Sequence, residues 1–244
     1  MEDIDAARVE LGAWKPSPVE VVAPDPAWPL WYAVVRDRVV AALGDRVLAI
    51  EHIGSTAVPG LWAKPMIDID ITVADSADED AWLPDLESVG FVLRVREPDW
   101  EEHRVLRGQQ PPTNLRVFSP DAREPHRHRM IRDWLRTHPE DRDRYAEVKR
   151  EVAGRGFYDA MLYNNGKAWF VYDLYESIFA ADPKHEHDPH PRPTKPASEA
   201  EQQLGSWRGH QLGWLGASVV TSAGIRAERD LGDRPRTSQR RCRR

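Results

Sequence analysis

Two aspartates, Asp68 and Asp70, are separated by one residue within a run of alternating polar and apolar side chains. Every odd position of the segment 67–73 is isoleucine or valine. A strand has a side-chain period of two, so it would bury these aliphatic groups and present both carboxylates on its opposite face. Acidic residues form strands poorly and repel one another on a shared face. The pattern therefore indicates that a cation neutralises the two aspartates.

Gly54 and Ser55 precede this strand and follow another expected strand at 46–52. Glycine lets a ligand approach the backbone closely, and serine adds a hydroxyl beside exposed N–H groups. A helical turn at the start of 56–62 would add a favourable N-terminus for a phosphate. Same-face residues two apart on a strand lie roughly 6.5–7 Å apart at Cα, which suits one Mg²⁺ or a pair of metal ions. The stretch thus predicts a phosphate beside metal-binding acids.

Composition limits the other functions of the chain. Its 244 residues are 41% apolar, so a sizeable core is expected in one domain. Residues 183–244 hold 12 Lys+Arg against 7 Asp+Glu, which leaves 22 against 33 in residues 1–182. Such an acidic body argues against nucleic-acid binding, which needs a concentrated basic face. Cys242 is the single cysteine, so an intrachain disulfide is excluded.

The sequence shows neither a secretory leader nor a membrane span. It begins Met-Glu-Asp-Ile-Asp, without a basic and apolar leader, and no apolar run approaches the roughly 18 residues of a spanning helix. These features predict a cytoplasmic protein that does not bind membranes. Residues 1–17 are expected to form an arm, 18–182 a domain, and the Pro- and Arg-rich 183–244 a disordered tail.

Periodicity predicts an α/β (α+β) domain with a mixed sheet flanked by helices and C-terminal helices after it. Strands are expected at 19–22, 46–52, 67–73, 91–96, 104–107 and 115–118, the last three as an antiparallel extension. Helices are expected at 26–43, with Asp25 as N-cap, and at 79–89, 127–137, 139–153 and 159–180. We interpret His126 and His128 as part of a solvated basic turn, with an anion clamp as the alternative, and Lys149 and Lys167 as structural salt-bridge partners.

The site residues also resemble a known superfamily. Gly54-Ser55, a spacer of twelve residues and Asp68-Ile69-Asp70 look like the signature of the DNA polymerase beta-like nucleotidyltransferases. The segments 51–60 and 64–69 more closely resemble the GrpB family, whose members are predicted nucleotidyltransferases. The resemblance covers about residues 18–180 and excludes the tail.

This resemblance implies a nucleotidyltransferase-like fold in which Gly54, Ser55 and Thr56 hold the phosphates of a nucleoside triphosphate. Lys64 would add positive charge. Asp68 and Asp70 would bind Mg²⁺ or Mn²⁺. Attack on the α-phosphorus would transfer a nucleoside monophosphate to an unknown small-molecule or protein acceptor, mainly through positioning and charge neutralisation.

One strand departs from the family pattern. GrpB-like sequences tend to read His-Leu-His-Val where this chain reads Asn114-Leu-Arg116-Val. The superfamily normally supplies a third carboxylate from a later strand, and neither of these residues is an acid. Arg116 is expected to pair with Asp68 or Asp70, or to bind a phosphate. Glu51 is the candidate replacement acid. The alternative function is a catalytically impaired nucleotide-binding or interaction domain of the same fold.

Overall fold

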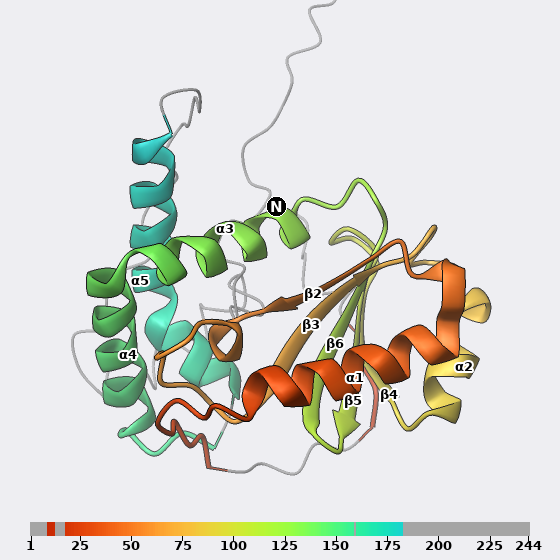
Figure 1. Cartoon of the computed structure of the whole chain (residues 1–244), viewed down its shortest axis with the longest axis horizontal. Coiled ribbons are helices and arrows are strands. Elements are labelled where there is room, and N and C mark those ends of the chain that lie inside the picture. Colours follow the sequence, from red (N-terminus) through yellow and green to blue (C-terminus); the bar gives the residue numbers. More distant parts are fainter. Residues whose placement is uncertain (1–8, 13–17, 159, 183–244) are drawn as a thin grey trace, which may run out of the picture.

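The computed structural model describes residues 9–12, 18–158 and 160–182, and the expected tail at 183–244 lies outside them. A six-stranded sheet flanked by helices forms this part of the chain (Figure 1). The strands are β1 (Val9–Glu10), β2 (Ala49–Ile53), β3 (Ile67–Thr72), β4 (Val92–Glu97), β5 (His103–Gln109) and β6 (Pro112–Phe118). The α-helices are α1 (Trp28–Leu43), α2 (Leu83–Ser88), α3 (Glu124–Thr137), α4 (Pro139–Ala153) and α5 (Ala160–Ala181). The expected mixed sheet with flanking helices is confirmed.

The strand order is β1-β4-β5-β6-β3-β2, and β3 and β6 form the parallel pair among antiparallel neighbours. Their register sets Asp68 beside Asn114, and Asp70 beside Arg116. On the other side of β3, the antiparallel β2 sets Glu51 opposite Asp70. Registered neighbours share a face of the sheet. The fold therefore gathers polar side chains from three strands onto one face.

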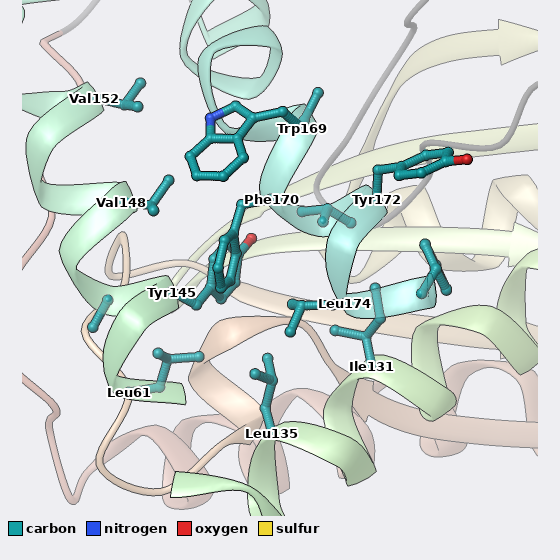
Figure 2. Packing of buried hydrophobic residues seen from close by; sticks show 14 of the residues in the cluster. Leu61, Ile131, Leu135, Tyr145, Val148, Val152, Trp169, Phe170, Tyr172 and Leu174 are labelled. Carbon is teal, nitrogen blue, oxygen red and sulfur yellow. The ribbon is translucent and has the colours of Figure 1, made fainter. Parts of the chain in front are cut away.

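Apolar packing occurs on both sides of this polar face. Helices α1 and α2 cover the opposite face of the sheet, where Ile67, Ile69 and Ile71 are fully buried. Helices α3, α4 and α5 form a second core with one another and with Val19, Val58 and Leu61 (Figure 2). Figure 1 shows α1 and α3 on opposite sides of the sheet. The polar face thus lies between two apolar layers, and its residues Asp70, Asn114 and Arg116 are buried there.

Several elements differ in extent from the sequence prediction. The expected strand at 19–22 is wrong, since only Val22 bridges, to Ala63. Helix α1 begins at Trp28, because the Asp25 carboxylate accepts the N–H of Ala27 at 2.8 Å in a preceding turn. The helix expected at 79–89 is split into a 3₁₀ turn and α2, with a proline in the first turn of α2. In the expected arm, β1 pairs with β4.

None of the helices within the described ranges is long and apolar enough to cross a membrane.

Candidate functional site

The two aspartates on β3 lie in a buried polar network. Asn114 donates to Asp68 Oδ1 at 2.7 Å, and Arg116 Nη2 donates to the same oxygen at 3.1 Å. The other terminal nitrogen, Arg116 Nη1, lies 3.9 Å from Asp70 Oδ1. As expected, Arg116 pairs with the aspartates. A fixed cation therefore lies across both carboxylates, which accounts for two acids on one face of a buried strand.

His128, from α3, completes the network at Asp70. Its Nδ1 lies 2.5 Å from Asp70 Oδ2, and both side chains are almost fully buried. Burial raises the pKa of Asp70, but His128 and Arg116 outweigh it, so the pKa lies below its ordinary value. The interpretation of His128 as part of a solvated turn is wrong. The burial of His128 could have been predicted from its spacing in the sequence. It lies three residues before Ile131 and seven before Leu135, which places all three on the inward side of the helix.

The Gly54-Ser55 turn packs directly against Asp68. Gly54 has φ +71°, and a Cβ at this position would lie 2.8 Å from Asp68 Oδ2. The expected helical turn is a short 3₁₀ helix, Ser55–Ala57. The Thr56 hydroxyl donates to the Met66 carbonyl at 3.2 Å, so this residue ties the turn to the start of β3. A phosphate-binding role for Thr56 stays a prediction.

We expect Gly54→Ala to lower the free energy of unfolding by about 2–4 kcal/mol, because it combines a strained positive φ with a clash against Asp68. Gly90→Ala is the matched control, since Gly90 has φ +90° and nothing within 4 Å of an added Cβ. Urea unfolding of both variants separates the clash from the backbone strain. Equal losses in the two variants would show that Asp68 does not fix the turn.

Glu51, the candidate third acid, is held by a helix residue. Arg132 Nη1 donates to Glu51 Oε2 at 2.7 Å and to the His52 carbonyl at 3.0 Å. The Glu51 side chain is 39% exposed, whereas that of Asp70 on the neighbouring strand is 3% exposed. Glu51 lies on the same face of the sheet as Asp70, at the edge of the network. Its role as a catalytic acid stays a prediction.

Three lysines lie around Tyr145 and Tyr163, and one of them contacts the Gly54-Ser55 turn. Lys149 of α4 donates to Ser55 Oγ at 3.0 Å and to the Trp62 carbonyl, and has no carboxylate partner among the described residues. The salt bridge expected for Lys149 is therefore wrong. Lys167 of α5 donates to Tyr145 Oη at 3.3 Å, and Lys64 Nζ lies 5.8 Å from the ring centre of Tyr163. Sequence reasoning selected Lys64 for the site but assigned Lys149 and Lys167 to structural roles.

A small cavity opens between the turn and the helices. It is lined by Gly54, Ser55, His128, Ile131, Arg132, Leu135, Tyr145 and Val171. Its lining combines polar residues of the turn and of α3 with apolar side chains, and Figure 2 shows the side chains of Ile131, Leu135 and Tyr145 among the helices. The cavity joins the Gly54-Ser55 turn to the buried Asp70–His128 pair.

The carboxylates do not form a ready metal centre. Asp68 Oδ1 and Asp70 Oδ2 are engaged by protein donors, and Asp70 Oδ1 alone is buried without a hydrogen-bond partner. Within the described ranges, no group of three or more His, Cys, Asp or Glu side chains could hold a metal ion. A hard divalent cation usually takes several oxygen ligands. As placed, these residues fit a guanidinium better than Mg²⁺ or Mn²⁺, whose binding stays a prediction.

Fold and site together define a mixed-sheet domain with a buried, charge-paired polar site under C-terminal helices. The family model described as GrpB protein matches residues 18–177. The chain belongs to the GrpB family.

Several known proteins are similar to this chain. The chain is 44% identical over 174 residues to a UPF0157 protein of Halalkalibacterium halodurans, covering 70% of this chain and 89% of that protein. The crystal structure of a conserved protein GrpB from Enterococcus faecalis superposes with a TM-score of 0.55 at 25% identity, covering 65% of this chain and 96% of that one. A dephospho-CoA kinase of Mycolicibacterium paratuberculosis is 30% identical over 186 residues, which cover 65% of this chain but only 46% of that protein.

Proposed function

We propose that this domain binds a nucleotide through its phosphate groups at the Gly54-Ser55 turn, without catalysing transfer. One observation carries the proposal: the Arg116 guanidinium lies across both aspartates, and its buried Nη1 has no hydrogen-bond partner. Guanidinium groups are well suited to phosphate oxygens, and a buried donor is stabilised when a ligand satisfies it. The site therefore offers a hydrogen-bond donor, Arg116 Nη1, where a transferase would need metal ions.

The same network argues against turnover. Transfer to a hydroxyl needs a group that accepts its proton, and no third carboxylate lies beside Asp68 and Asp70 on β6, where Asn114 and Arg116 stand. Both residues instead hold the aspartates in place. A nucleotide bound here would be retained rather than consumed, as expected of a sensing or interaction domain.

Titration calorimetry with ATP, GTP, CTP and UTP at fixed ionic strength tests this proposal. We expect binding that persists in EDTA and releases no pyrophosphate. Ser55→Ala should weaken binding about fivefold, because it removes one hydroxyl contact worth about 1 kcal/mol. Ser88→Ala is the control, since its hydroxyl donates to a local carbonyl in α2. Absence of binding by all four nucleotides would refute the proposal.

Metal-dependent nucleotidyl transfer is the second candidate. It is favoured by the position of Asp68 and Asp70 on one face beside Gly54-Ser55, and by the unpartnered Asp70 Oδ1. Carboxylate oxygens are the usual protein ligands of Mg²⁺, which would neutralise the triphosphate during transfer. Pyrophosphate release that requires Mg²⁺ or Mn²⁺ and is lost in Asp68→Asn would select this candidate over simple binding.

A further inference from the structure

We propose that Lys149 is a positioning residue of the nucleotide site: it holds the Ser55 hydroxyl so that the hydroxyl hydrogen points into the cavity and donates to a phosphate oxygen. The inference rests on the proposed nucleotide binding and deepens it, because it assigns the contact with the ligand to Ser55 and the supporting contact to Lys149. Lys149 itself does not touch the ligand in this arrangement.

The two hydroxyl groups of the turn are used differently. Thr56 is 4% exposed, and its hydroxyl donates to the Met66 carbonyl at 3.2 Å, so its hydrogen is committed within the protein. Ser55 is half-buried and lines the cavity. Its oxygen accepts a hydrogen bond from Lys149 at 3.0 Å, and its hydroxyl donates to none of the described residues. The hydrogen of Ser55 is therefore the one that the turn can offer to a ligand.

The direction of the hydrogen bond between Lys149 and Ser55 decides where that hydrogen points. A hydroxyl has one donor and two acceptor lone pairs, and its hydrogen rotates away from a donor that approaches the oxygen. The ammonium group thus excludes the orientation toward α4 and leaves the orientation toward the cavity. A hydrogen bond received from a cation also polarises the O–H group, which strengthens the bond that this group donates in turn.

Lys149 is surrounded by groups that favour its protonated, donating form. Besides the bond to Ser55, its Nζ donates to the Trp62 carbonyl and lies 4.4 Å from the ring centre of Tyr145. An ammonium group has three donors and no acceptor, which matches two oxygen acceptors and one ring face. Burial and the neighbouring Lys167 lower the pKa of Lys149, and these three contacts oppose that shift.

The burial of Lys149 keeps the ammonium group behind the serine. Its side chain is 2% exposed on α4, and among the described residues it has no carboxylate partner that would draw it away from the turn. Ser55 lines the cavity, whereas Lys149 does not. A buried ammonium group in this position is suited to orient the residue that meets the ligand rather than to meet the ligand itself.

A purely structural role is the competing explanation. In that case Lys149 only ties the loop at Trp62 to α4, and its loss weakens nucleotide binding whether or not Ser55 is present. A positioning role requires the two losses to be coupled, because Lys149 acts on the ligand only through the Ser55 hydroxyl. A double-mutant cycle separates the two explanations.

Calorimetry with ATP, GTP, CTP, UTP and pyrophosphate, at fixed ionic strength, measures this coupling in the full chain. We expect Lys149→Met to weaken binding about fivefold, as Ser55→Ala does, because both changes remove the same hydroxyl contact. The double variant should also lose about fivefold, whereas independent losses would multiply to about 25-fold.

Arg150→Met is the matched control for Lys149→Met. The Arg150 guanidinium carbon lies 4.7 Å from the ring centre of Trp62, so this residue packs on the same loop from the next position of α4. Its side chain is exposed, and its loss should change the affinity by less than about twofold.

Neutron diffraction gives a second measurement that needs neither a variant nor a ligand. Wild-type crystals exchanged into D₂O show the deuterons of Ser55 and Lys149 directly. We expect a fully deuterated ammonium group with one deuteron directed at Ser55 Oγ, and the Ser55 deuteron directed into the cavity. A Ser55 deuteron directed at Lys149 Nζ would overturn the inference even if the variants do not fold.

The outcomes separate this inference from the proposed function. If nucleotides bind and the two losses multiply in the double variant, Lys149 is not a positioning residue and nucleotide binding stands. If pyrophosphate binds with coupled losses while no nucleotide binds, the positioning role stands and the proposed function fails. If the wild type binds neither pyrophosphate nor any nucleotide, both fail.

Discussion

Lys167→Met is expected to raise the free energy of unfolding of the ligand-free protein, because burial makes the charged form of Lys167 costly in the folded state. The pKa of Lys167 falls from 10.5 to about 7 on folding, and each pKa unit is worth about 1.4 kcal/mol, which sets a ceiling near 5 kcal/mol.

The pH dependence of this gain has a defined sign. Between about pH 7 and 10.5 the unfolded chain keeps a proton on Lys167 that the folded chain has lost. The free energy of unfolding of the wild type therefore rises with pH across that window. The difference in the free energy of unfolding between variant and wild type becomes smaller. Urea unfolding of wild type and variant between pH 6.5 and 9.5 measures the difference, with Arg150→Met as the control. A gain that does not fall with pH would contradict this assignment.

Asp70→Asn should have the opposite effect, with a loss of about 3 kcal/mol in the free energy of unfolding. Asp70 is 3% exposed and accepts from His128 at 2.5 Å beside the Arg116 guanidinium. Removing its charge leaves a buried cation with one fewer counter-charge, and breaking such a pair typically costs about 3–5 kcal/mol. The amide can still contact His128, so the lower end of that range is expected.

Because the pKa of Asp70 is lowered on folding, its carboxylate stabilises the protein at neutral pH, above the unfolded value of 3.8. That contribution is lost as the pH falls through the lower folded pKa, so wild type and variant should converge in acid. Asp37→Asn is the control, since Asp37 is 69% exposed and pairs with Arg36 on the surface. The control is expected to lose about 0.5 kcal/mol in the free energy of unfolding. A loss in Asp70→Asn no greater than this would show that the network contributes nothing to stability.

Alternation and spacing were enough to predict the centre of the fold. The period-two run placed Ile67, Ile69 and Ile71 in one core and both aspartates on the other face. Helix α4 begins and ends at the predicted residues, because its proline at the start and its charged and apolar faces are local signals. The pairing of Arg116 with the aspartates could also be predicted from the sequence, because two buried acids need a cation.

What the sequence could not supply was the covering of the polar face. His128 and Lys149 are polar residues of charged helices, and local pattern does not distinguish a buried polar position from a solvated one. Their burial depends on how α3 and α4 fold back over the sheet. Boundary errors at α1 and α2 arose at the turns before each helix, where Asp25 accepts the N–H of Ala27 before α1 and a 3₁₀ turn precedes α2.

The seam between the sheet and the C-terminal helices is joined largely by side-chain bonds. His128 binds Asp70, Arg132 binds Glu51, Arg136 donates to the Ala57 carbonyl at 2.8 Å, and Lys149 donates to Ser55. Helices α3 to α5 share an apolar core with Val19, Val58 and Leu61, so the helices and these residues are suited to open from the sheet as one cooperative unit. A ligand bridging the seam would then slow that opening, and helical segments far from the ligand would become better protected from solvent.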